Sequence, residues 1–255
     1  MANEKIVIAF DLYGTLLSTE SIAKELARHF GEEKAQSVAA LWRRYIQKPN
    51  IATCNLSSTL ALYKPFSDVT NSSLNHALAE HGLSLSDADT ESLMKAYDNL
   101  GTFPDVEAGL KEIADDPSIE AYIFSNGTDA MVGSSVNKSP SLSKHASVFK
   151  GLVTVEDIKV YKPAPLVYQH LAKKVGKSTR KDDMATIWLV SGNPFDIVGA
   201  RASGLQAAWI DRAGGHHGNG GWTDRLGELA SGGPTVIVKG VEDAVHDIQN
   251  WSKEN

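Results

Sequence analysis

The stretch KIVIAFDLYGTL, residues 5–16, decides the fold. Its first six residues form a nearly continuous apolar run, a pattern typical of a parallel strand that is buried on both faces. The run ends at Asp11, and Gly14 follows three residues later. Because ligands bind at the carboxyl ends of the strands in open α/β sheets, Asp11 is expected to lie in a site.

Three later segments repeat this format of an apolar run that ends in polar residues. They are 121–124 before Ser125-Asn126-Gly127, 187–190 before Ser191-Gly192-Asn193, and 207–210 before Asp211-Arg212. Helical patterns separate the runs, at 105–115, 164–175 and 195–202. Strands that alternate with helices in regular order predict an α/β fold, a doubly wound and mainly parallel sheet with polar residues along one edge.

About a hundred residues between the first and the second strand break this rhythm and indicate helices alone. Helical patterns cover 21–30, 32–47, 70–81 and 86–99, and a glycine or a proline follows each pattern as a stop signal. The stretch 49–68 is irregular and is assigned to no element. We therefore expect an α/β core domain of residues 1–17 and 103–255, with an inserted helical cap domain at 18–102.

The composition argues against several classes of protein. With 255 residues, 42% hydrophobic and 22% charged, the chain is long and apolar enough for one core with an insert. A formal net charge of -6 gives no reason to expect a nucleic acid partner. No apolar run approaches the ~20 residues that span a bilayer, so no membrane is expected. The single cysteine, Cys54, rules out an intrachain disulfide, and we expect a cytoplasmic protein without a signal peptide.

Asp11 is the first candidate for chemistry. An acidic residue at the end of a buried strand must be paired or exposed in a site, although a cap or a turn is a simpler role for it. A carboxylate is ionised at neutral pH and can act as a nucleophile without a base to activate it. It needs a cation to hold it in place. Lys162 is the candidate, since Pro163 suits the first position of a helix, although a lone lysine there is normally a surface residue.

The polar segments at the strand ends are commonplace helix caps when each is taken alone. In chain order, however, they resemble the four motifs of the haloacid dehalogenase superfamily: Asp11-x-Tyr13-Gly14-Thr15, Ser125-Asn126-Gly127, Lys162-Pro163 and Ser191-x-Asn193-x-x-Asp196. The resemblance spans residues 6–212. It implies that the doubly wound core carries a helical cap and that Asp11 is the nucleophile.

Most members of that superfamily are phosphatases, which hold Mg²⁺ with acidic side chains. Here Tyr13 stands two positions after Asp11, and the last motif has Ser191 and Asn193 where a phosphatase has acidic residues. We therefore expect no metal site and no cofactor. These departures are similar to the L-2-haloacid dehalogenases (type II), also called (S)-2-haloacid dehalogenases. Further residues fit that subfamily: Leu41-Trp42-Arg43 in the second cap helix, Tyr168 and Phe195.

The resemblance implies hydrolysis of short L-2-haloalkanoic acids to 2-hydroxy acids with inversion, through an aspartyl ester on Asp11. Lys162 would hold that carboxylate, and Arg43 with Asn126 would receive the halide ion. Asp196, positioned by Asn193 and Ser191, would orient or deprotonate the water. Ser125 and nearby backbone amides, such as those of Leu12 and Tyr13, would bind the substrate carboxylate. The other expected substrate-binding residues are Asn126, Tyr168, Phe195 and Phe66. The subfamily also suggests a homodimer.

Three other functions stay open on the sequence alone. A phosphatase with an unusual Mg²⁺ site would lose its activity without added metal. A hydrolase of another α-substituted acid, such as azetidine-2-carboxylate, would use the same ester chemistry and differ in its leaving group. A non-catalytic binding protein is disfavoured, because Asp11, Lys162 and Asp196 would then gather charge without purpose. His216 and His217 lack a third ligand spaced for zinc and are expected to be exposed. Neither the preferred halide nor the preferred chain length is predicted.

Overall fold

The computed structural model describes residues 5–60, 63–97, 99–214 and 225–254, and it describes no side chains at 47–60 or 225–226. Its centre is a six-stranded sheet in the order β3-β2-β1-β4-β5-β6. Every neighbouring pair of strands is parallel. The predicted doubly wound, mainly parallel sheet is therefore confirmed. The strands are β1 (Ile6–Phe10), β2 (Ile119–Ser125), β3 (Phe149–Thr154), β4 (Ile187–Ser191), β5 (Gln206–Ile210) and β6 (Val236–Val238).

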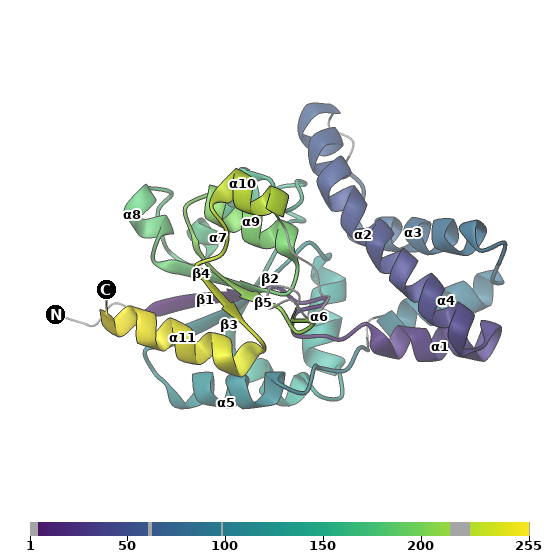
Figure 1. Cartoon of the computed structure of the whole chain (residues 1–255), viewed down its shortest axis with the longest axis horizontal. Coiled ribbons are helices and arrows are strands. Elements are labelled where there is room, and N and C mark those ends of the chain that lie inside the picture. The colour runs from purple at the N-terminus through teal and green to yellow at the C-terminus, as the bar shows by residue number, and fades with distance from the viewer. Residues whose placement is uncertain (1–4, 61–62, 98, 215–224, 255) are drawn as a thin grey trace.

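Helices cover both faces of this sheet (Figure 1). One face carries α5 (Val106–Asp115) and α11 (Val241–Glu254). The other carries α7 (Pro165–Lys174), α8 (Lys181–Met184), α9 (Pro194–Ala202) and α10 (Arg225–Ser231). Because both faces are covered, the central strand β1 is apolar along its length instead of alternating. Its residues from Val7 to Phe10 are at most 2% exposed.

The strand order reverses between β1 and β4, and this reversal positions the site. From β1 the sheet continues through β2 and β3 on one side, and through β4, β5 and β6 on the other. Ligands of open α/β sheets bind at such a switch point, outside the carboxyl ends of the strands. Asp11 comes directly after β1, and its backbone N–H donates to the carbonyl of Val190 in β4 at 3.0 Å. The topology thus brings the first and last motifs together.

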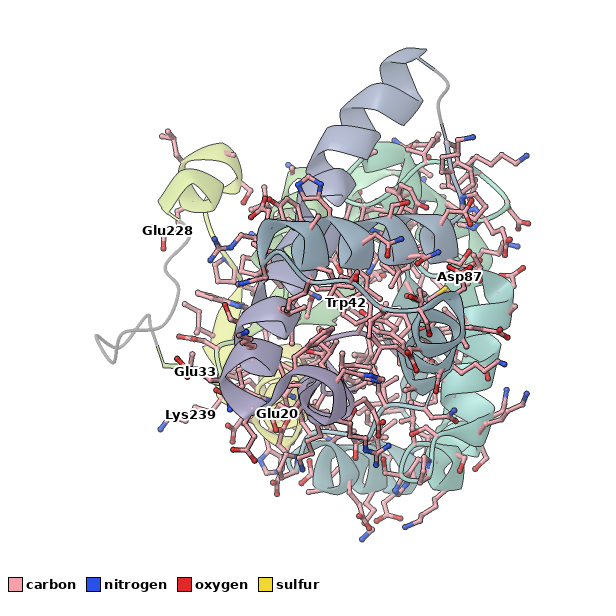
Figure 2. The ribbon with its side chains drawn as sticks, turned by 90° about the vertical axis from the view of Figure 1, so that its right-hand side faces the viewer. Glu20, Glu33, Trp42, Asp87, Glu228 and Lys239 are labelled. Atoms are coloured by element: carbon pink, nitrogen blue, oxygen red, sulfur yellow. The ribbon has the colours of Figure 1, made fainter. Side chains whose placement is uncertain are left out.

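Four helices follow β1 and lie beside the sheet: α1 (Glu20–Phe30), α2 (Glu32–Leu60), α3 (Phe66–Glu80) and α4 (Asp87–Tyr97). The structure describes no strand in this part of the chain, and α1 packs on α2 and α4 while α2 packs on α3. Trp42 joins α2 to α3, since its indole N–H donates to the carbonyl of Thr70 at 2.8 Å. Figure 2 shows Trp42 inside this helical group, with Glu20, Glu33 and Asp87 at its outside. The exact boundaries of the cap, 18–102, stay a prediction.

The predicted end of the second helix before Pro49 is wrong, because the backbone of α2 stays helical to Leu60. A proline removes one i→i−4 hydrogen bond but permits helical turns on both sides of it. Most of the stretch 49–68 therefore belongs to α2 and to the start of α3 at Phe66, four residues before the predicted start. Although α2 has 29 residues, no helix in the described ranges is both long and apolar enough to cross a bilayer.

Several elements of the core were not predicted from the sequence. The strands among them, β3 and β6, lie at the two edges of the sheet. Only Phe149, Val153 and Thr154 of β3 are buried, so this strand lacks the continuous apolar run of the central strands. β6 is three residues long and offers no pattern. The helices among them are α6 (Asp129–Lys138), the short 3₁₀ helix at Ser143–Val148, α8, α10 and α11.

The contact between α5 and α11 depends on Gly109. A Cβ atom there would lie 2.8 Å from Cγ1 of Val241 and 2.9 Å from the backbone nitrogen of Glu242. Since backbone cannot move aside cheaply, we expect Gly109→Ala to lower the free energy of unfolding by about 1–3 kcal/mol. Gly133→Ala in α6 is the matched control, because a Cβ there would meet no atom within 4 Å. That change should be neutral or stabilise by up to about 1 kcal/mol. Urea unfolding followed by circular dichroism measures both, and equal stability of the two variants would contradict the close packing.

Candidate active site

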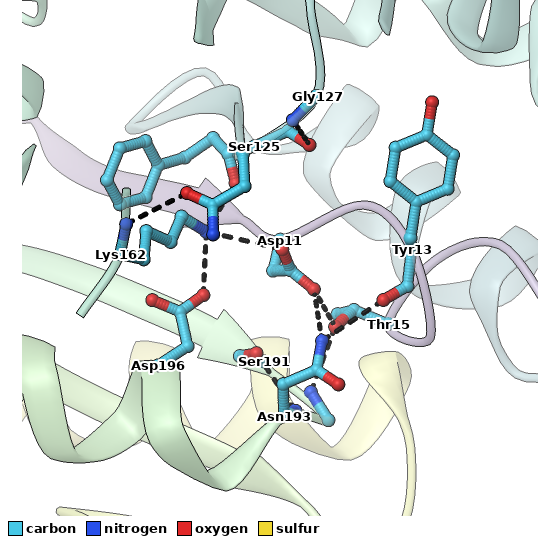
Figure 3. A network of polar contacts seen from close by, with 12 residues as sticks. Asp11, Tyr13, Thr15, Ser125, Gly127, Lys162, Ser191, Asn193 and Asp196 are labelled. Atoms are coloured by element: carbon cyan, nitrogen blue, oxygen red, sulfur yellow. Dashed lines mark hydrogen bonds and ion pairs between the residues drawn. The ribbon is translucent and has the colours of Figure 1, made fainter. Parts of the chain in front are cut away.

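The carboxylate of Asp11 is held by three donors from three segments of the chain (Figure 3). Its Oδ2 accepts hydrogen bonds from the hydroxyl of Thr15 and from Nδ2 of Asn193, both at 2.8 Å. Its Oδ1 accepts from Nζ of Lys162 at the longer distance of 3.2 Å. Thr15 is fixed in turn, because its Oγ1 accepts from the backbone N–H of Gly192 at 2.9 Å. Oδ2 is therefore firmly bound, and Oδ1 is the less constrained oxygen.

Lys162 is buried, with 1% of its side chain exposed, so its charge must be paired. Besides Asp11, its ammonium group donates to Oδ2 of Asp196 at 2.6 Å and to the carbonyl of Phe124 at 2.7 Å. The same Nζ lies 4.1 Å from the centre of the Phe124 ring. The backbone N–H of Lys162 donates to Oδ1 of Asn126 at 2.9 Å, which fixes the approach of the chain. The predicted pairing of Lys162 with Asp11 is confirmed, and the lysine also bridges to Asp196.

Asp196 lies in the first turn of α9 and is 0% exposed. Removal from water raises the pKa of its carboxyl group to about 6, and the nearby Asp11 acts in the same direction while Lys162 opposes both. Its Oδ1 accepts from the hydroxyl of Tyr168 at 2.7 Å. That phenol passes directly over Gly199, where a side chain would collide with it. Asp196 can therefore take up a proton close to neutral pH, and Tyr168 sets its orientation.

The serines of the two turn motifs shape the backbone. Oγ of Ser125 accepts from the N–H of Gly127 at 3.1 Å, and Oγ of Ser191 accepts from the N–H of Asn193 at 3.0 Å. Each serine thus closes a turn after its strand. The amide of Asn193 donates to Asp11 and, at 3.0 Å, to the carbonyl of Tyr13. We expected Asn193 and Ser191 to position Asp196, but the bonds above place Asn193 on the nucleophile instead.

A cavity of about 40 Å³ lies beside Asp11. The structure brings most of the predicted residues to it, and Lys162, Ser191 and Asp196 belong to the polar network around Asp11 (Figure 3). The lining residues are Asp11, Tyr13, Thr19, Arg43, Ile46, Phe66, Tyr97, Ser125, Asn126, Asn193 and Phe195. Two predicted substrate-binding residues do not line it. Tyr168 is turned to Asp196. The side chain of Leu12 is buried in the core, and binding through its backbone amide stays a prediction.

Thr15, Thr19, Ile46 and Tyr97 were not predicted as site residues. Thr15 stands in the first motif, four residues after Asp11, and that spacing was the signal that could have identified it. Tyr97 ends α4, and its ring lies 5.4 Å from that of Tyr13, centre to centre. Burial raises the pKa of Tyr97 far above its usual range, so the phenol stays neutral. Its place depends on helix packing, and no local pattern in the sequence indicates it.

Arg43 reaches the cavity from α2 across Gly14. A Cβ atom at Gly14 would lie 2.5 Å from Nη2 of Arg43, and the φ angle of 82° at this position also favours glycine. The guanidinium group is half-buried and forms no hydrogen bond or ion pair with the described residues. A partly buried arginine without a protein partner is suited to receive an anion. Its charge is therefore available to a ligand at Asp11.

The side chains at Asp11 do not fit Mg²⁺. In the described ranges, no three histidine, cysteine or acidic side chains converge as metal ligands, and His216 and His217 lie outside those ranges. Asp11 and Asp196 both contact the ammonium group of Lys162, which would repel a cation placed between them. Tyr13, two positions after Asp11, turns its hydroxyl to Oγ of Ser135 at 3.1 Å. Magnesium is usually held through carboxylates, and Asp11 and Asp196 are both already bound to Lys162.

Known proteins share this arrangement of motifs and fold. The family described as haloacid dehalogenase-like hydrolase matches residues 7–204. An (S)-2-haloacid dehalogenase of Pseudomonas sp. (strain YL) is 30% identical over 210 residues, which cover 81% of this chain and 83% of that protein. Haloacetate dehalogenase H-2 of Moraxella sp. (strain B) is 28% identical over 207 residues, covering 81% and 86% of the two chains. A crystal structure of an L-2-haloacid dehalogenase, 26% identical, superimposes with a TM-score of 0.83 and covers 97% of this chain and 100% of that one. The chain therefore belongs to the haloacid dehalogenase-like hydrolases.

Proposed function

We propose that this protein hydrolyses short L-2-haloalkanoic acids to 2-hydroxy acids through an aspartyl ester on Asp11, without a metal ion. The relatives named above are dehalogenases of (S)-2-haloacids and of haloacetate. One observation carries the proposal. The Asp11 carboxylate is fixed by Lys162, Thr15 and Asn193 beside a cavity that Arg43 lines without a hydrogen bond or ion pair to any described residue.

The first step is a displacement at the α-carbon. We infer that Oδ1 of Asp11 attacks, because Oδ2 is held by two shorter hydrogen bonds. The new C–O bond forms on the side opposite the carbon–halogen bond, and the halide leaves with the bonding electrons, which inverts the centre. Arg43 receives the developing charge. Asn126 supports it, since its Oδ1 is bound to the N–H of Lys162 and its NH₂ group is left to face the cavity.

The substrate carboxylate binds at the turn after β2. Oγ of Ser125 accepts a hydrogen bond from the N–H of Gly127, so its own proton is free to be donated to the substrate. Aromatic side chains enclose the carbon atoms. Phe66 and Tyr13 stack with their ring centres 6.4 Å apart, and Phe195 lines the same cavity. This wall excludes water from the first step.

The second step hydrolyses the ester. Water attacks Cγ of Asp11 and gives one proton to Asp196. The acyl C–O bond then breaks, the departing alkoxide takes that proton from Asp196, and the 2-hydroxy acid leaves. The other proton of the water stays on the new Asp11 carboxyl group, which loses it to regenerate the carboxylate. Once Oδ1 is esterified, Oδ2 becomes the carbonyl oxygen. Thr15 and Asn193 already donate to it at 2.8 Å, so they stabilise the oxyanion of the tetrahedral intermediate. The homodimer and the cytoplasmic location stay predictions.

The origin of the product oxygen distinguishes this mechanism from direct attack by water. A single turnover of L-2-chloropropionate in oxygen-18 water containing EDTA should release chloride. Because Asp11 supplies the oxygen, the 2-hydroxy acid of that turnover should lack the heavy isotope, which should appear in Asp11 instead. Mass spectrometry of both species measures this. Heavy oxygen in the product would exclude the ester, loss of activity in EDTA would favour a metal enzyme, and no chloride release would favour the azetidine-type hydrolase.

The pH dependence reports on Asp196. This carboxyl group must be ionised to accept a proton, so kcat should fall as the pH falls through about 6. The hydrogen bond from Tyr168 lowers the pKa of Asp196. Tyr168→Phe removes it, and the midpoint should move to higher pH by roughly half a unit to one unit. Tyr122→Phe, which removes a hydroxyl on β2 that bonds to Glu120, is the control. Identical midpoints in the two variants would show that Asp196 is not the titrating base.

The role of Arg43 is tested by removing its charge. Arg43→Ala should reduce kcat for halide release by about 10²–10³, the usual cost of losing a donor that stabilises developing charge. The fold should persist, because no hydrogen bond or ion pair to the described residues is lost. Arg180→Ala, which breaks an exposed contact with Asp183, should leave kcat unchanged. Halide release at saturating substrate, with circular dichroism for the fold, makes the comparison. Near-normal rates in Arg43→Ala would remove the arginine from the mechanism.

A further inference from the structure

A second and much larger hollow adjoins the cavity at Asp11. This outer pocket has a volume of about 770 Å³, and Arg43 and Phe195 line both spaces. The backbone also links the two, since Gly14 and Gly192 line the outer pocket while their neighbours Tyr13 and Asn193 line the cavity. Two side chains and two glycine-containing turns thus separate the outer pocket from the nucleophile.

The two spaces differ greatly in size. The cavity beside Asp11 measures about 40 Å³, whereas the outer pocket measures about 770 Å³. The outer pocket is therefore the space with room for a carbon chain of several methylene groups. Ligand pockets usually measure about 300–1,000 Å³, and the outer pocket falls within that range.

The lining of the outer pocket is mainly apolar. Its walls include Phe103, Trp209 and Ile210, besides Ala40, Phe195 and Ala213. One of its cations is already neutralised, because Arg212 donates to both carboxylate oxygens of Asp105, at 2.9 and 2.7 Å. Arg44 is exposed to solvent. The charged lining residues are Arg43, Arg44, Asp211 and Arg212, and the rest of the wall is mainly apolar, which suits a hydrocarbon chain.

We propose that the outer pocket receives the carbon chain of the substrate, so that the enzyme prefers 2-haloalkanoic acids longer than three carbons. This inference rests on the proposed function. During the displacement, Asp11 and the halide lie on opposite sides of the attacked carbon. The three groups that stay on this carbon are the carboxylate, the chain and a hydrogen, and they point at right angles to the line from Asp11 to the halide. With the carboxylate at Ser125, the chain leaves the cavity sideways between Arg43 and Phe195 and enters the outer pocket.

The test compares kcat/KM for (S)-2-bromopropionate and (S)-2-bromohexanoate, which differ by three methylene groups. Each buried methylene is worth roughly a fourfold gain in binding, and ordering the chain offsets part of that gain. We expect the wild-type protein to show a kcat/KM about tenfold higher for the hexanoate. The short substrate also tests the proposed function by itself.

Two variants fill the outer pocket from different walls, Ala40→Phe on α2 and Ala213→Phe after β5. Both alanines are exposed and belong to no proposed catalytic group, so the fold should tolerate the change. Each variant should lose about tenfold in kcat/KM for the hexanoate and less than twofold for the propionate. The matched control is Ala79→Phe, an exposed position on α3 outside this pocket. It should change neither value, and thermal unfolding verifies that all three variants fold.

Each outcome is decisive. The outer pocket would be excluded as the chain site if the protein turned over the propionate without preferring the hexanoate. It would also be excluded if the two filling variants matched Ala79→Phe on both substrates. Either result would leave the proposed function standing. An equal loss on both substrates in the filling variants would also overturn it, because the pocket would then be only an entrance. No turnover of either bromoacid would overturn the proposed function and this inference together.

Discussion

The buried ammonium group of Lys162 holds the whole site together. Asp11 and Asp196 would repel each other in a space so poor in water, and Lys162 lies 3.2 and 2.6 Å from them. Lys162, Asp11 and Asp196 together carry one net negative charge, so the uptake of a proton by one of the two carboxyl groups is favoured. Burial directs that proton to Asp196, whose pKa is raised to about 6. In the proposed mechanism, one lysine thereby lets two aspartates serve as nucleophile and as base. Removing it would leave buried charge unpaired, at a cost of about 3–5 kcal/mol.

The parallel sheet makes this arrangement possible. Three neighbouring strands end at the site: β2 contributes the carbonyl of Phe124, β1 is followed by the carboxylate of Asp11, and β4 ends in the turn at Ser191. Parallel strands present all their carboxyl ends on one edge, so side chains far apart in the sequence converge without long loops. Lys162 then enters from the segment before α7, and its backbone is fixed by Asn126.

Much of this core was predictable, and the reasons for the exceptions are physical. The central strands are continuous apolar runs because helices cover both faces, and the polar residues after them mark the site. The edge strands β3 and β6 lack such runs, and Pro49 suggested a helix end that the backbone does not make. In the site, the residues from the core motifs were predicted best. Tyr97 and Ile46 reach Asp11 through the packing of the cap helices, which no local pattern records.

The two groups of site residues come from separate parts of the chain. One group lies at the sheet edge around Asp11: Thr15, Lys162, Asn193 and Asp196. The other group belongs to the helices inserted between β1 and β2: Arg43, Ile46, Phe66 and Tyr97. In the proposed mechanism, the ester chemistry and the recognition of the leaving group thus depend on different segments of the chain. During evolution, the inserted helices could diverge, or be replaced, to accept another leaving group while the inherited nucleophile and its partners remained unchanged.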